Sequence, residues 1–109
     1  MDPYENPERR MIKLKGLQKM KKVLHLNLYR KYFDQILKGE KTIEYREVTP
    51  YWSKRLEGRH YDVIQFRNGY AKIAPVMIVE FKGMDIDNDV QGARYAIELG
   101  NILETKNVI

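Results

Sequence analysis

Residues 23–47 read VLHLNLYRKYFDQILKGEKTIEYRE, and this stretch contains three successive patterns. Every second residue from 24 to 28 is leucine, which predicts a half-buried strand. Apolar residues then recur at spacings of three and four as far as Leu37, which predicts an amphipathic helix ending at Lys38. Gly39 can take the left-handed conformation that often follows a helix. Because the period returns to two over residues 41–47, the stretch predicts a strand, a helix and a second strand.

Local signals outline the next part of the chain. Thr49-Pro50 is an N-cap residue followed by proline at the first helical position, which predicts a short helix presenting Trp52 and ending at Gly58. Residues 61–67 contain Val63, Ile64 and Phe66 and predict a strand that should bury Phe66. Asn68-Gly69 follows at once and predicts a two-residue type I′ turn, because both positions accept positive φ at low cost.

The second half is predicted to be mostly strand. A return strand is expected over residues 70–81, with Pro75 at a bulge or an edge. Residues 82–93 are rich in aspartate and predict a polar connection, and residues 95–103 predict a final strand bent at Gly100. About five to six strands with two short helices inserted early indicate an α+β fold. We expect its mixed sheet to close into a small β-barrel, because closure removes exposed edges.

The charge is concentrated at one end of the 109-residue chain. Seven basic and three acidic residues in the segment 1–22 account for four of the five net positive charges. This composition predicts a basic N-terminal arm over residues 1–22, preceding a single domain over residues 23–109. A second interpretation is that the native product starts at Met20.

The sequence has no cysteine, no secretory signal pattern and no apolar run long enough to span a bilayer. We therefore expect a cytoplasmic protein with no membrane partner. The alternating Asp85, Asp87 and Asp89 lack the glycine and glutamate of a calcium loop. The two histidines lack a partner at ligand spacing, so we expect no metal and no cofactor.

The segment from Lys41 to Arg46 carries the most chemistry. A strand there places Thr42, Glu44 and Arg46 on one face, with Ile43 and Tyr45 on the other. Since Ile43 is the natural core residue, we expect the polar face to point outward. Glu44 and Arg46 can then pair, and Lys41, in the preceding turn, can swing onto the same face.

The pattern Gly39-x-Lys41-x-x-Glu44-x-Arg46, within its strand–helix–strand context, resembles the signature of the activating-signal-cointegrator homology (ASCH) family. That resemblance implies a fold similar to the PUA domain, with a ligand cleft and a role in RNA metabolism. One branch of that family, whose members are similar in size to this chain, hydrolyses the amide of N4-acetylcytidine with a Lys, a Thr and a Glu. This sequence has Glu44 where that branch has its Thr, and Glu80 and Glu98 are candidates for the third residue, a downstream Glu.

Three functional hypotheses follow. In the first, a cleft binds a nucleotide or single-stranded RNA. Arg46 then contacts phosphate or a base edge, Lys41 contacts phosphate, and Glu44 orients Arg46 or accepts a hydrogen bond from a base amine. Tyr45 or Tyr51 can stack on a base. In the second, the domain is a small amidohydrolase in which Lys41, if desolvated, serves as base or nucleophile and Glu44 as proton shuttle. In the third, it is a non-enzymatic interaction domain. We expect Trp52 and Phe66 to pack in the core under all three.

Overall fold

The computed structural model describes residues 22–89 and 91–108, which form five strands and two helices. Strand β2 (Val23–Asn27) leads into helix α1 (Arg30–Leu37) and strand β3 (Ile43–Glu47). Helix α2 (Pro50–Leu56) and strand β4 (Val63–Arg67) follow. The long strands β5 (Val76–Asp89) and β6 (Gly92–Lys106) complete the chain. The predicted α+β class, with two helices ahead of the later strands, is therefore confirmed.

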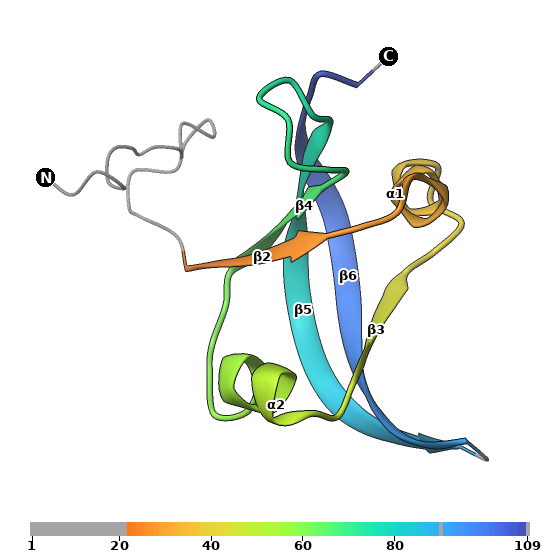
Figure 1. Ribbon diagram of the computed structural model, residues 1–109, viewed down its shortest axis with the longest axis vertical. Coiled ribbons are helices and arrows are strands. Elements are labelled where there is room, and N and C mark those ends of the chain that lie inside the picture. The colour runs from red at the N-terminus through yellow and green to blue at the C-terminus, as the bar shows by residue number, and fades with distance from the viewer. Residues whose placement is uncertain (1–21, 90, 109) are drawn as a thin grey trace, which may run out of the picture.

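The strands form one mixed sheet in the order β2-β4-β5-β6-β3. β2 and β4 are parallel, with Val23 opposite Val63, and the other neighbouring pairs are antiparallel. The sheet curls into a half-barrel, so that β2 and β3 are its two edge strands (Figure 1). The predicted curvature is confirmed, but these edges are not paired to each other as a closed barrel would require.

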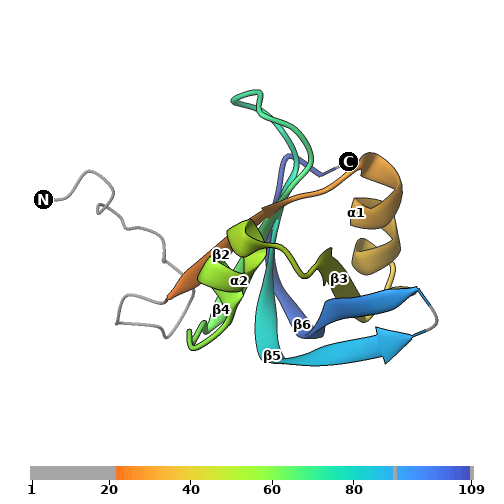
Figure 2. The same cartoon turned by 60° about the horizontal axis from the view of Figure 1, so that its bottom comes forward.

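The β5–β6 hairpin causes much of the curl. Between Val79 opposite Ile102 and Phe81 opposite Leu99, one residue of β5 faces two residues of β6, which is a β-bulge. Further register shifts lie on either side of it. Bulges increase local twist and bend a strand. The far end of the hairpin consequently bends away from β4 and carries β3 on its other edge (Figure 2).

The hydrophobic core fills the concave side of the sheet and is covered by both helices. Helix α1 contributes Phe33 and Ile36, and α2 contributes Leu56. The predicted alternation is confirmed, since Leu24 and Leu26 of β2 and Leu28 just after it are buried. The three central strands add the remaining core residues: Ile64, Phe66, Met77, Val79, Tyr95, Ile97 and Leu99. Burial of these apolar surfaces is the main stabilising contribution.

The helix boundaries follow the sequence signals. Lys38 is the C-cap of α1, and Gly39 has a φ of 81°, the left-handed conformation predicted for it. At the start of α2, the Thr49 side chain accepts a hydrogen bond from the Trp52 backbone N–H at 3.2 Å. Gly58, with a φ of 70°, follows the end of α2. These predictions are confirmed.

The predicted type I′ turn at Asn68-Gly69 is wrong. The chain from residue 68 to residue 75 forms an eight-residue loop, and Arg67 pairs with Val76 across it. Gly69 has a φ of 104°, but the φ of Asn68 is not positive. Both residues instead bond to the end of β2, about 40 positions earlier in the chain, which local turn statistics do not register. The return strand consequently starts after Pro75, not at residue 70.

The predicted polar connection over residues 82–93 is also wrong. β5 continues to Asp89 and β6 begins at Gly92, so the aspartates lie within a strand. Arg94 on β6 pairs with Asp87 at 3.1 Å and with Asp89 at 3.5 Å. This polar sequence remains extended because its alternating aspartates share one solvated face of the strand, where Arg94 on the neighbouring strand pairs with them.

The basic arm over residues 1–22 lies outside the described residues except for Lys22, whose backbone N–H donates to the Asp62 carboxylate at 2.9 Å. Among the described residues, no helix has the length and apolarity needed to cross a membrane.

Candidate functional site

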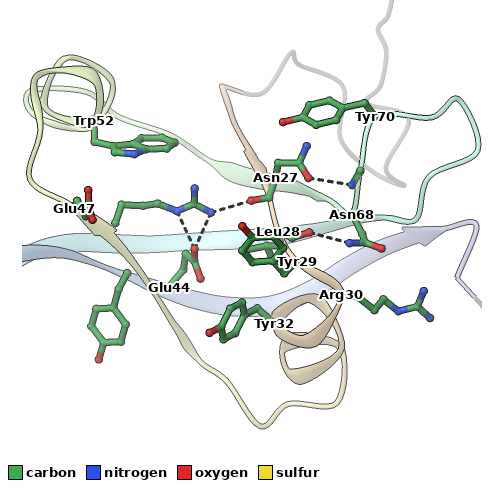
Figure 3. Close-up of a pocket in the computed structure, with 13 residues that line it drawn as sticks. Asn27, Leu28, Tyr29, Arg30, Tyr32, Glu44, Glu47, Trp52, Asn68 and Tyr70 are labelled. Carbon is green, nitrogen blue, oxygen red and sulfur yellow. Dashed lines mark hydrogen bonds and ion pairs between the residues drawn. The ribbon is translucent and has the colours of Figure 1, made fainter.

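A hollow of about 710 Å³ opens between the two edge strands of the half-barrel. Its wall comes from the end of β2, the start of α1, β3, α2 and the loop after β4 (Figure 3). We call it the larger hollow, and its lining residues are Asn27, Leu28, Tyr29, Arg30, Tyr32, Glu44, Tyr45, Arg46, Glu47, Trp52, Asn68, Gly69 and Tyr70. The wall is therefore rich in aromatic rings and holds two arginines and two glutamates.

Arg46 is fixed at the centre of this wall. Its Nε and Nη2 both lie close to Glu44 Oε2, at 2.9 and 2.8 Å, and Nη2 also donates to the backbone carbonyl of Asn27 at 3.1 Å. The guanidinium carbon lies 4.9 Å from the centre of the Trp52 ring, within cation–π range. Charge-assisted hydrogen bonds of this kind hold a planar fork in one orientation.

Glu44 is the only charged residue among the described ones that is buried, with 6% of its surface exposed. Its second oxygen, Oε1, lies 3.5 Å from Lys41 Nζ. The same ammonium lies 5.5 Å from the ring centres of both Tyr32 and Tyr45. One buried carboxylate thus holds two cations, which satisfies a charge that would otherwise be costly to bury.

The predicted pairing of Glu44 with Arg46 and the predicted swing of Lys41 towards them are confirmed. The predicted direction of this face is wrong: Glu44 points into the half-barrel, while Ile43 is 36% exposed. Tyr45, also 36% exposed, packs its ring 3.7 Å from the Arg94 guanidinium. The polar face turns inward because its charges neutralise one another there and because Arg46 reaches the opposite edge strand.

The opposite wall of the larger hollow is a set of amide groups. The Asn68 side-chain amide donates to the Leu28 carbonyl at 2.9 Å, and the Gly69 N–H donates to the Asn27 side-chain oxygen at 3.0 Å. Figure 3 shows these two contacts beside Tyr70 and facing Glu44 across the hollow. The loop after β4 is therefore attached to β2 at the site itself.

A second hollow of about 360 Å³, here called the smaller hollow, adjoins the larger one at Arg46 and Trp52. It shares Asn27, Arg46, Trp52 and Tyr70 with the larger hollow, and it adds side chains from β2, β4 and α2: His25, Leu26, Tyr51, Gln65 and Arg67. The two hollows together form one continuous candidate site around the Arg46 guanidinium.

Helix α2 contributes the Tyr51 and Trp52 rings to the site, and its end is attached to β6. The hydroxyl of the buried Tyr95 on β6 donates to the carboxylate of Glu57, the C-cap residue of α2. This hydrogen bond raises the pKa of Tyr95. Tyr51 packs edge-on against Trp52 with 4.8 Å between ring centres. The Tyr95–Glu57 contact therefore attaches the end of α2 to β6, and the Tyr51 ring packs on Trp52 within the helix.

The sequence predicts Lys41, Glu44, Tyr45 and Arg46 as site residues, and the structure adds several lining residues to them. Trp52 was assigned to the core alone; it packs against the core and also lines both hollows. Asn27, Tyr29 and Tyr70 carried no motif, and only the fold brings them to Arg46. Arg67 was noted in the sequence as a basic residue beside Asn68-Gly69 that can touch phosphate, and the fold places it in the smaller hollow. Lys41 lines neither hollow, and Glu80 and Glu98 also lie outside both.

In the described part of the chain, no group of three or more histidine, cysteine, aspartate or glutamate side chains is arranged to hold a metal ion. Comparison of the chain with protein-family models, with curated proteins and with solved structures finds no match.

Proposed function

We propose that this protein binds a nucleotide or a short segment of single-stranded RNA between its two edge strands, in a role in RNA metabolism. The observation that supports this proposal most directly is the guanidinium of Arg46, held by Glu44 and Asn27 beside the Trp52 ring in a wall of aromatic side chains. Planar stacking surfaces and a fixed donor fork are the two features that single-stranded nucleic acids use.

Arg46 has donor capacity left for a ligand. Its Nε and Nη2 are engaged by Glu44 and Asn27, whereas no described residue accepts a hydrogen bond from Nη1. Glu44 and Lys41 then act as positioning residues, since Lys41 contacts the carboxylate and lines neither hollow. This role of Lys41 replaces the phosphate contact expected from the sequence.

The exposed tyrosines at the rim add stacking surface. Tyr29 is 81% exposed and Tyr70 is 88% exposed, although both line the larger hollow. The resemblance of Gly39-x-Lys41-x-x-Glu44-x-Arg46 to the ASCH family supports the same proposal, because that family is associated with RNA.

A second candidate function is hydrolysis of the amide of a modified nucleoside such as N4-acetylcytidine. The 3.5 Å contact between Lys41 Nζ and Glu44 Oε1 is the observation that favours it, because a base and a proton shuttle must lie this close. Binding is favoured over hydrolysis because the Lys41 ammonium already contacts a carboxylate and two ring faces. Incubation with N4-acetylcytidine, followed by chromatography for cytidine, tests the candidate.

The single tryptophan makes the binding proposal directly testable, because Trp52 lines both hollows. Titration with uridine monophosphate and with a short single-stranded oligouridylate should change its fluorescence and give saturating curves. Absence of binding by the wild-type protein to any nucleoside, nucleotide or RNA would leave only the interaction-domain hypothesis.

Two variants make the test specific. Tyr29→Ala removes an exposed ring at the rim and should lower oligouridylate affinity at least fivefold, since stacking on one base contributes about 1–3 kcal/mol. Ile86→Ala is the matched control, because Ile86 is also exposed, at 50%, but lies on the hairpin outside both hollows. Equal affinities of the two variants would contradict the assignment of the larger hollow.

A further inference from the structure

The two hollows differ in their charge. The larger hollow is lined by Arg30 and Arg46 against Glu44 and Glu47, so its charges balance. The smaller hollow is lined by Arg46 and Arg67, and none of its described lining residues is acidic. An anionic group of a ligand is therefore stabilised in the smaller hollow, whereas a neutral aromatic group fits the larger one.

Arg67 is held by carbonyl groups and not by a carboxylate. Its Nε donates to the Gly69 carbonyl at 3.1 Å and its Nη2 donates to the Ala71 carbonyl at 2.5 Å. Carbonyl acceptors fix a guanidinium without neutralising it. Among the described residues, Arg30, Arg46 and Arg94 each pair with a carboxylate. Arg67 has no carboxylate partner among these residues.

The free charge of Arg67 faces the smaller hollow together with Gln65 and His25, which add polar groups from β4 and β2. The residues shared by the two hollows include Arg46 and Trp52. A ligand whose base stacks in the larger hollow can therefore extend its sugar and phosphate across Arg46, towards Arg67. Guanidinium groups are well suited to phosphate oxygens because their donors match in geometry.

We propose that the smaller hollow is a phosphate subsite, with Arg67 as its principal ligand-binding group and Arg46 at its boundary. This inference rests on the proposed function and narrows it, because the preferred ligand then carries a phosphate next to the bound base. The phosphate has two sources: the terminal group of a mononucleotide, or the internucleotide linkage of an RNA.

The test compares ligands that differ only in phosphate. Trp52 fluorescence is titrated with uridine, uridine 5′-monophosphate, uridine 3′-monophosphate and the dinucleotide UpU. At least one phosphate-bearing ligand should bind at least tenfold more tightly than uridine, and the ratio should fall at higher salt. UpU distinguishes an internucleotide phosphate from the terminal groups of the two monophosphates.

Variants of the subsite provide the control for charge. Arg67→Gln should reduce the ratio of phosphate-ligand affinity to uridine affinity towards one. Arg59→Gln should keep the ratio, because Arg59 also donates to a backbone carbonyl, that of Lys54 at 3.2 Å, but lies outside both hollows. Gln65→Glu should also lower the ratio, because it adds a negative charge to the lining of the smaller hollow while Arg67 itself is kept.

The outcomes distinguish this inference from the proposed function. Equal affinities of uridine and all three phosphate ligands in the wild-type protein would overturn the subsite while leaving nucleoside binding intact. A tenfold ratio that survives both Arg67→Gln and Gln65→Glu would also overturn it, since the phosphate would then lie elsewhere. Failure of every ligand to bind would refute the proposed function itself.

Discussion

The Arg46 guanidinium on β3 donates a hydrogen bond to the backbone carbonyl of Asn27 on β2, with 3.1 Å between Nη2 and the oxygen. These residues belong to the two edge strands of the half-barrel, which are not neighbours in the sheet. A side chain thus connects the strands where a closed barrel would have a ladder. Glu44 makes this connection possible by holding the guanidinium in place.

This relationship predicts that Glu44 and Arg46 contribute to stability as a unit. Glu44→Ala leaves Arg46 and Lys41 without their carboxylate, and Arg46→Ala leaves a buried carboxylate with a single partner. Each change should lower the free energy of unfolding by about 1–3 kcal/mol, since a buried charged group is then incompletely satisfied. The double variant should lose clearly less than the sum of the singles in urea unfolding.

Asp34→Ala provides the comparison for this cycle. The Arg30–Asp34 pair has a similar N–O distance, 3.1 Å, but its side chains are 63% and 39% exposed. Its loss should change the free energy of unfolding by about 0.5 kcal/mol or less. Additive effects of Glu44→Ala and Arg46→Ala, as small as that of Asp34→Ala, would show that the edge strands do not depend on the pair.

Gly100 is predicted to be required by the bulge in the β5–β6 hairpin. A Cβ at this position would lie 2.6 Å from Glu80 Oε1 and 2.9 Å from both Glu80 Cβ and Lys82 Cδ. The contact with Glu80 Cβ cannot be relieved by rotation of a side-chain end, so Gly100→Ala should destabilise by about 1–3 kcal/mol in urea unfolding. Asn101→Ala, at the exposed neighbouring position, should stay within about 0.5 kcal/mol.

Asn68 is predicted to attach the loop after β4 to the site. Asn68→Ala removes the donor to the Leu28 carbonyl and should lower the free energy of unfolding by about 1 kcal/mol. It should also speed hydrogen exchange of the Gly69 amide, which bonds to Asn27 beside it. Lys72→Ala, at an exposed position of the same loop, is the control, and equal exchange rates in both variants would contradict the anchor role.

His25 predicts a pH dependence of stability. Desolvation lowers the pKa of His25 below its ordinary value of 6.5, so the folded protein binds this proton less readily than the unfolded chain. The resulting contribution to stability is present above pH 6.5 and is lost as the pH falls through the lowered pKa of the folded state. The effect should be small, because the residue reaches solvent.

Thermal melts from pH 7.5 to pH 5 test this prediction. The wild-type melting temperature should fall more steeply over that range than that of His25→Gln, which has no titrating group at the position. Identical slopes for the two proteins would assign the pH dependence to other groups.

The sequence by itself determined the elements whose signals are local. The leucine alternation of β2, the cap at Thr49 and the terminating Gly39 each depend on backbone groups within a few residues, so their outcome could be read directly. The pairing of Glu44 with Arg46 is also local, because residues two apart on a strand share a face.

Only the tertiary structure decided which way that face points and what surrounds it. Period-two alternation fixes which residues share a face but not which face meets the core, and Ile43 favoured the wrong choice. Likewise, Asn68 and Gly69 bond to Leu28 and Asn27 at the end of β2, 40 and 42 positions earlier in the chain. They do not form the tight turn that the dipeptide favours locally. The site therefore depends on contacts between distant segments, because hydrogen bonds and charge pairs across the open edges of the sheet outweigh local preference.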